Sequence, residues 1–255
     1  MVDISVLWRM LVRMAAALVP AALAAALMGC AYPPPDLNVQ LIGAGLASAN
    51  EQAGSSAQWD TYAEAAAALR ELGIDGLTDE CIKELEASEM EYPAGAEIDR
   101  ALVLLSTVGW GAIDPETWVW TPSENGVYCF DAEVLDESAM YTDFLRGISA
   151  IGCGELEFTD IREDTSAVDW ETGTGNRTVS FCWNGEMHIL HARAMGDWFD
   201  ADAAEQLSRI IAQNGGEKRL YFTSSGQECF VFYRDAGWAE AFSERTGIVL
   251  SDKAR

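Results

Sequence analysis

Residues 178–192 read TVSFCWNGEMHILHA and are the stretch that says most about the fold. Two runs rich in β-branched and aromatic residues flank Asn184-Gly185, the pair preferred in a two-residue type I′ turn. Such a turn fixes the register of the two strands, because Trp183 must then face Glu186. The stretch therefore predicts a β-hairpin with a defined pairing.

Side chains alternate between the two faces of a strand, so this register also assigns faces. One face should carry Val179, Phe181, Trp183, His188 and Leu190. The other face should carry Cys182, Met187, Ile189 and His191. Both sets contain apolar residues, so we expect both faces to be partly covered. The two histidines should point apart, which argues against a shared metal ion.

Patterns of helices and hairpins extend on both sides of this stretch. Helical periodicity is expected over residues 59–72, 79–89, 97–108, 137–151, 201–213 and 235–246. Strands are expected over residues 117–120, 127–134, 155–162, 219–223 and 228–233. The run FVFY within the last strand is apolar on both faces, which places that strand in the centre of a sheet. The predicted fold class is α+β: N-terminal helices followed by a mostly antiparallel sheet of hairpins, with interspersed helices.

The charge of the chain restricts its partners. Its 255 residues include 41 acidic and 16 basic side chains, for a net charge of −25. Such a protein is repelled by phosphate backbones and anionic lipid head groups, so we expect no nucleic-acid binding. The sequence has no glycine-rich nucleotide-binding pattern, no GxSxG and no CxxC. We therefore expect no cofactor.

The N-terminus has the layout of an export signal. Residues 14–27 read MAAALVPAALAAAL, carry no charge and follow Arg9 and Arg13. The run is shorter than the roughly 20 apolar residues of a membrane span. At the end of this run, residues 27–30 read LMGC. They resemble the lipobox of bacterial lipoproteins, which has an aliphatic residue three positions before a cysteine and a small residue directly before it.

The resemblance implies cleavage before Cys30 and lipid on its thiol, which together would anchor the protein to the outside of the cell membrane. In a cell with two membranes, the outer membrane is also an option. The alternative is an ordinary signal peptide or an uncleaved anchor with an incidental cysteine. Translation could start at Met1 or at Met10.

The chain then divides into segments of different composition. We interpret residues 1–29 as the signal peptide and residues 30–57, which include PPP and GAGLASANEQAGSS, as the lipidated cysteine and a flexible tether. Residues 58–250 are predicted to form a single α+β domain, with 58–110 as a candidate helical subdomain. Residues 251–255 form a tail.

Two groups of residues are candidates for ligand contacts. Trp118 and Trp120 would share one face of a strand, where they could stack on a sugar or peptide if exposed, or contribute to the core if buried. The second group lies in a predicted acidic, glycine-rich loop over residues 163–176 and just before it. Its weak candidates for a calcium ligand set are Asp160, Glu163, Asp164, Asp169 and Glu171. The EF-hand spacing is absent, so a solvated loop is the favoured interpretation and no metal is expected.

The cysteines say little about disulfide pairing. If lipid occupies Cys30, the remaining five are Cys81, Cys129, Cys153, Cys182 and Cys229. Export permits disulfides, but the odd number leaves at least one thiol unpaired within the chain, and the connectivity is open. Cys182 and Cys229 fall in predicted hairpins and should be largely buried.

An anchor and a linker without a catalytic motif favour a binding or interaction module over an enzyme. Its partners would be the membrane, through the lipid on Cys30, and a protein, peptide or glycan ligand. Two alternatives stay open: a cell-envelope hydrolase that uses scattered Asp, Glu or His, and a structural or assembly factor of the envelope.

Overall fold

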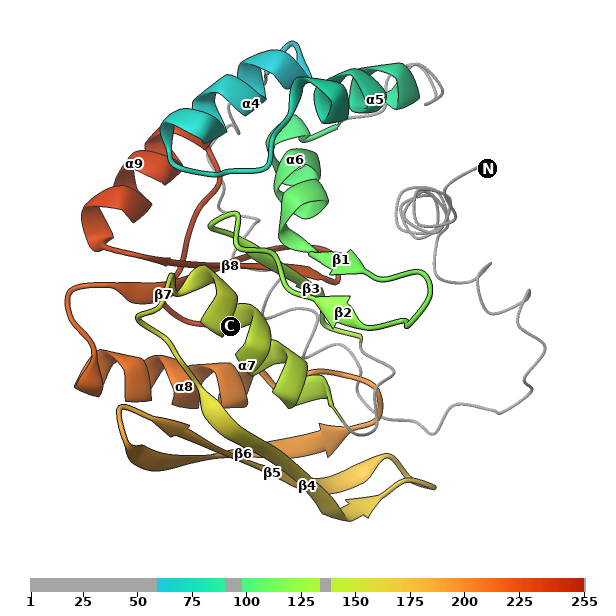
Figure 1. Cartoon of the computed structure of the whole chain (residues 1–255), viewed down its shortest axis with the longest axis vertical. Helices are drawn as coiled ribbons and strands as arrows, with labels where there is room; N and C mark the ends of the chain where they lie inside the picture. The colour runs from blue at the N-terminus through green and yellow to red at the C-terminus, as the bar shows by residue number, and fades with distance from the viewer. Residues whose placement is uncertain (1–58, 90–97, 134–138, 255) are drawn as a thin grey trace.

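The computed structural model describes residues 59–89, 98–133 and 139–254. The described chain is built in four layers: helices, a three-stranded sheet, two helices and a second three-stranded sheet (Figure 1). This arrangement confirms the predicted α+β class with antiparallel sheets. The predicted signal peptide, Cys30 and the tether lie outside the described residues. No helix within the described ranges is long and apolar enough to cross a membrane.

The first layer consists of helices that begin where the sequence offers a cap. They are α4 (Tyr62–Glu71), α5 (Asp79–Glu89), α6 (Arg100–Gly109) and α9 (Ala236–Thr246). Thr61 and Glu64 form a reciprocal capping box at the start of α4. Helix α6 begins three residues later than predicted, because Asp99 is its N-cap and accepts a hydrogen bond from the Leu102 N–H.

The first sheet lies between two apolar cores. Its strands are β3 (Tyr128–Asp131), β8 (Glu228–Arg234) and β7 (Arg219–Ser225), in the order β3-β8-β7. Val231 and Tyr233 of β8 face the core shared with the second sheet, whereas Phe230 and Phe232 face the core under α4, α6 and α9. The central position predicted for this strand is therefore confirmed, and its two apolar faces have a structural reason.

Two helices fill the space between the sheets. Helix α7 (Met140–Ile151) contacts β3, β8 and β4, and α8 (Ala201–Asn214) contacts β6 and β7. Gly147 lies where α7 crosses Tyr128, and a Cβ atom there would come within 2.4 Å of the tyrosine ring. The glycine therefore permits a close approach of the helix to the sheet.

The second sheet contains the predicted hairpin. Its strands are β4 (Thr159–Asp169), β5 (Thr174–Trp183) and β6 (Glu186–Met195). Trp183 pairs with Glu186, as predicted, and Asn184 and Gly185 have φ of 54° and 78°, as a type I′ turn requires.

Only one face of this sheet is covered. Val179, Phe181 and Leu190 are fully buried, whereas Met187 and Ile189 are 63% and 50% exposed. The prediction that both faces would be partly covered is therefore wrong for the second face. An antiparallel sheet can leave one face in water, and here α7 and α8 cover the other.

Two further predictions of local structure are wrong. The acidic loop expected over residues 163–176 is the second half of β4, a short turn and the start of β5. Its polar side chains suit a strand at the edge of a sheet with one face in water, so the composition misled the interpretation. Of the strand expected over residues 117–120, only Trp120 belongs to a strand; β1 (Ala112–Ile113) and β2 (Trp120–Thr121) form a small hairpin.

Candidate interaction surface on the β1–β2 hairpin

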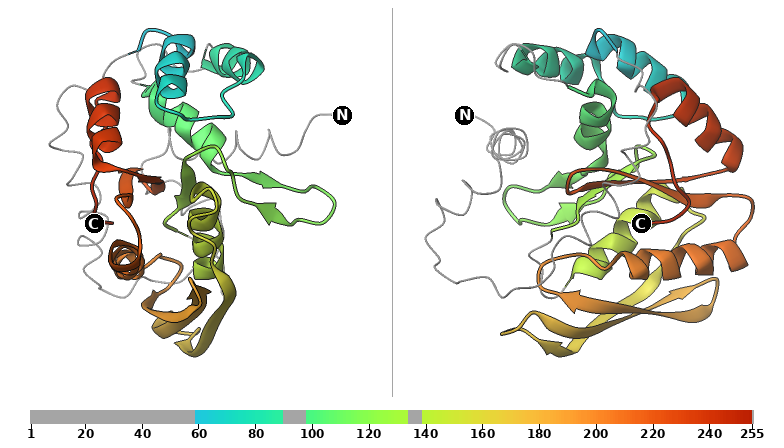
Figure 2. Two further views of the ribbon diagram at one scale, coloured as in Figure 1. Left: turned by 60° about the vertical axis from the view of Figure 1, so that its left-hand side comes forward. Right: turned by 180° about the vertical axis from the view of Figure 1, so that it is seen from behind.

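The hairpin of residues 112–121 projects from the body of the molecule (Figure 2). Its turn is ordered by Asp114, whose carboxylate accepts hydrogen bonds from the N–H groups of Glu116 (2.9 Å) and Thr117 (2.7 Å). The backbone hydrogen bond from Thr117 is the main reason that the pKa of Asp114 is lowered. The turn is thus held by an ionised side chain and has a defined shape.

Trp118 is the most unusual residue of this hairpin. It is 75% exposed, and its φ of 58° lies in the left-handed region. For a residue with a Cβ atom this conformation costs about 1–2 kcal/mol. Ile113 and Val119, also on the hairpin, are 40% and 54% exposed. An exposed apolar tip around a strained tryptophan gains little for folding, and such strain is often found where a protein binds a partner.

Trp120 has a different role from Trp118. Its indole N–H donates to the carbonyl oxygen of Trp110 at 2.8 Å, and its ring lies 6.0 Å from that of Tyr128. The Arg146 guanidinium lies 5.8 Å from its ring centroid. Trp120 is therefore half-buried and attaches the hairpin to the core. The two tryptophans therefore do not form the predicted pair on one face: Trp118 is exposed to solvent, and Trp120 attaches the hairpin to the core.

The acidic candidates for a metal site are dispersed along β4 and the turn after it. Asp164 accepts a hydrogen bond from the Ser166 N–H, and Asp169 accepts one from the Glu171 N–H, so these two carboxylates order local turns. Asp160 is exposed and has a φ of 52°. Within the described ranges, no three His, Cys, Asp or Glu side chains lie close enough together to hold a metal ion.

Glu163 is the exception among these acids, because its side chain turns inward. It forms an ion pair with Arg177 at 2.8 Å, and both side chains are at least 98% buried. Its second oxygen accepts hydrogen bonds from the N–H groups of Tyr141 (3.0 Å) and Thr142 (3.1 Å). Helix α7 has no side-chain cap of its own, so Glu163 caps it from a neighbouring strand. Sequence spacing gave no sign of this contact.

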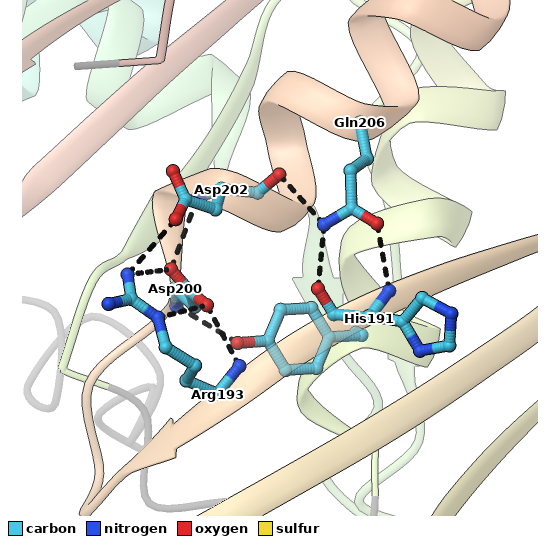
Figure 3. Close-up of polar contacts among 6 residues, drawn as sticks. His191, Arg193, Asp200, Asp202 and Gln206 are labelled. Carbon is cyan, nitrogen blue, oxygen red and sulfur yellow. Dashed lines mark hydrogen bonds and ion pairs between the residues drawn. The ribbon is translucent and has the colours of Figure 1, made fainter.

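A polar cluster joins α8 to the free edge of β6 (Figure 3). Gln206 accepts from the His191 N–H at 2.9 Å and donates to the His191 carbonyl oxygen at 2.6 Å. Asp200 accepts from the Arg193 N–H at 2.8 Å and pairs with the Arg193 guanidinium at 3.0 Å. His188 points to the opposite face and lies against Phe181, 5.4 Å between ring centroids. The two histidines therefore point apart, as the register predicted.

A hollow of about 300 Å³ beside the β5–β6 turn is lined by Glu155, Glu157 and Cys182, among other residues. Glu155 forms an ion pair with Lys218 and accepts a hydrogen bond from the Tyr233 hydroxyl at 3.3 Å. The hydrogen bond from Lys218 is the main cause of its lowered pKa, which makes Glu155 a poor proton donor near neutral pH.

The five described cysteines form no disulfide with one another. Cys129 and Cys229 are buried, and burial raises the pKa of both thiols. Cys182 is only half-buried, because its side chain lies on the uncovered face of the second sheet. Burial was thus correctly predicted for Cys229 and overestimated for Cys182.

Among these features, the β1–β2 hairpin combines exposed apolar area, backbone strain and a defined shape. Neither Trp118 nor Trp120 lines the hollow beside the β5–β6 turn. Comparisons with protein-family models, with curated protein sequences and with solved structures found no match.

Proposed function

We propose that this chain is an exported, lipid-anchored binding module that takes a protein partner through the β1–β2 hairpin. The observation that carries the proposal is Trp118, which is 75% exposed in a left-handed backbone conformation at the tip of a projecting turn. Tryptophan contributes more binding energy than most residues when it enters a pocket of a partner, because it buries a large rigid surface. Trp120 supports the tip by fixing it to the core.

The chemistry of the tip favours a protein over a glycan or a lipid surface. A sugar platform would need Trp118 and Trp120 side by side and open, whereas Trp120 is half-buried under Arg146. Insertion into anionic lipid is disfavoured by Asp114 and Glu116 in the same turn. An apolar pocket rimmed by basic groups would match Trp118 and its acidic neighbours.

The location of the protein in the cell is part of the proposal. Arg9 and Arg13, the uncharged residues 14–27 and the LMGC sequence at 27–30 support export and a lipid on Cys30. The tether of residues 30–57 would then hold the domain outside the membrane and leave the hairpin free to meet a partner. The hydrolase and assembly-factor alternatives stay as predictions, since no described feature favours either.

Photo-crosslinking tests the binding role directly. A benzoylphenylalanine at position 118 of the full chain, in intact native cells, should give one discrete protein adduct on irradiation. Position 170 is the matched control, because Trp170 is also an exposed tryptophan in a turn, 42% exposed, but it lies over Arg177. Equal labelling from both positions, or adducts with lipid alone, would contradict the proposal.

A further inference from the structure

Along one half of the free edge of β6, other side chains bind the outward backbone hydrogen-bonding groups, whereas along the other half these groups have no such contact within the described residues. In β6, the odd-numbered residues direct their N–H and C=O groups away from β5. The contacts of His191 and Arg193 with α8 and its N-cap demonstrate this, because Gln206 of α8 and the N-cap Asp200 bind those groups from outside the sheet (Figure 3). The same alternation applies to Met187 and Ile189.

No hydrogen bond to the outward backbone groups of Met187 or Ile189 comes from any part of the chain that the structure describes. Their side chains are also exposed, at 63% and 50%, on the uncovered face of the sheet. By contrast, the edge of β7 is covered by Ser251, which exchanges two backbone hydrogen bonds with Phe222 at 2.7 and 2.9 Å. A short, apolar and unprotected edge is a template for pairing with another strand.

The size and charge of this edge decide what fits it. Two copies of the chain would meet through only residues 186–189, far less than the roughly 1,200 Å² that a stable interface buries. Each copy also carries a net charge of −25, so two copies repel each other. An extended peptide needs less area, and positive charge on it would be attracted to the protein.

We infer that residues 186–189 of β6 bind an extended basic segment of a partner protein as an added antiparallel strand. The partner's apolar residues would lie opposite Met187 and Ile189 and exchange backbone hydrogen bonds with them. Its intervening side chains would lie on the side of the sheet that carries Glu186, which is exposed at the end of β6 next to the turn, so lysine or arginine fits beside it. This edge is separate from the β1–β2 hairpin, so the inference does not depend on the proposed function.

A seven-residue peptide of alternating lysine and valine, titrated into the full chain in mild detergent by calorimetry, tests the inference. Two N-methylated forms provide the decisive comparison, because they have equal charge and the same side chains. Methylation of the valine nitrogens removes the N–H groups that would face β6 and should weaken binding at least tenfold. Methylation of the lysine nitrogens, which would face solvent, should change the affinity less than threefold. Equal weakening by both forms would show attraction by charge alone and overturn the inference.

A variant of the protein gives an independent test. Ile189→Pro removes the outward N–H without breaking a bond to β5, since proline is tolerated at a strand edge. It should weaken binding of the unmethylated peptide at least tenfold, whereas Ile189→Ala keeps the N–H and should have a smaller effect. Trp118→Ala should leave peptide binding unchanged. Unaltered binding by Ile189→Pro, or a dimer that this variant dissociates, would overturn the inference. If Ile189→Pro does not fold, the methylated peptides on the unaltered chain still decide.

Discussion

At the scale of single residues, two positions of the β5–β6 turn hold the register of ten residue pairs. Gly185 has a φ of 78° and no heavy atom within 4 Å of where a Cβ would lie. A substitution there is therefore strained in its backbone alone. We expect Gly185→Val to lower the free energy of unfolding by about 1 kcal/mol or more, measured by urea denaturation. Gly216→Val is the control, because Gly216 has equal space and no positive φ; equal losses would contradict the assignment.

The buried pair of Glu163 and Arg177 leads to a second prediction at this scale. Removing one member of a buried ion pair commonly costs about 3–5 kcal/mol. Glu163→Gln removes the negative charge at Arg177 and keeps an oxygen for the N–H groups that begin α7. We expect a large fall in denaturation midpoint, whereas Asp164→Asn on the exposed side of the same strand should change it little. Similar midpoints for both variants would mean that the pair does not form.

The sequence predicted single residues well where the contact is local. Asn184 and Gly185 define a turn by themselves, and the helices expected from residues 201 and 235 begin within one residue of those positions, where Asp200 and Asp235 are the N-caps. It could not separate Trp118 from Trp120, because exposure depends on a turn made by Asp114. Nor could it reveal Glu163 as a cap for α7, since that contact spans more than twenty residues.

At the scale of elements, α7 depends on one residue without a side chain. A Cβ on Gly147 would lie 2.4 Å from the ring of Tyr128, which is itself 97% buried and cannot move aside. We expect Gly147→Ala to destabilise the protein by about 1–3 kcal/mol, although alanine is the better helix former. A thermal melt would measure this. An increase in stability would mean that α7 does not lie on β3 as described.

The junction of β6 and α8 should make stability sensitive to acid. Burial alone would raise the pKa of Asp200, but hydrogen bonds from the Arg193 side chain and backbone outweigh it, so the pKa is lowered. A lowered pKa gives stability that is present above the ordinary value near 4 and is lost as the pH falls through the folded value. The free energy of unfolding of the native chain should therefore decline below about pH 4.

Asp200→Asn should reduce this decline, and Arg193→Met should do the same because it removes the main partner of the carboxylate. The measurement is urea denaturation at a series of pH values between about 2 and 7. The two substitutions together should have hardly more effect than either alone, since they act on one interaction. Parallel pH curves for the native chain and Asp200→Asn would exclude the assignment.

The helices and strands with a clear hydrophobic periodicity were predicted best. Segments interpreted from their amino-acid composition alone were predicted least well. Helix α8 begins at the predicted residue 201 and α9 begins one residue after the predicted residue 235, and β8 is central because its residues are apolar on both faces. The second half of β4 is predicted wrongly as a loop, because acids and serine on a water-facing edge resemble loop composition. Only its pairing with β5 defines it as a strand.

At the scale of the whole molecule, the order of the layers could not be predicted from the sequence, because local patterns do not indicate which faces of the elements pack together. The patterns gave the α+β class, but not that α7 and α8 lie between two sheets. The proposed attachment to the membrane is likewise a property of the whole chain, and it needs a separate test.

Cys30→Ala should abolish incorporation of radiolabelled fatty acid and move the protein from the membrane to the soluble fraction. The reason is that the thiol of Cys30 would be the acceptor of the diacylglyceryl group. Cys153→Ala is the matched control, because Cys153 is an exposed cysteine of the folded part and should keep both label and location. Label that still enters Cys30→Ala would exclude the lipobox.

The pairing of β3 with β8 has a consequence for the order in which the protein can fold. Tyr128 pairs with Val231, so α7, the second sheet and α8 all lie between the two partners in the sequence. Pairings over such distances form slowly, since a long loop must close first. Because β8 contributes to both cores, a nascent chain cannot complete either core until residues 228–234 are available. The two cores therefore mature together once β8 has been made, rather than layer by layer.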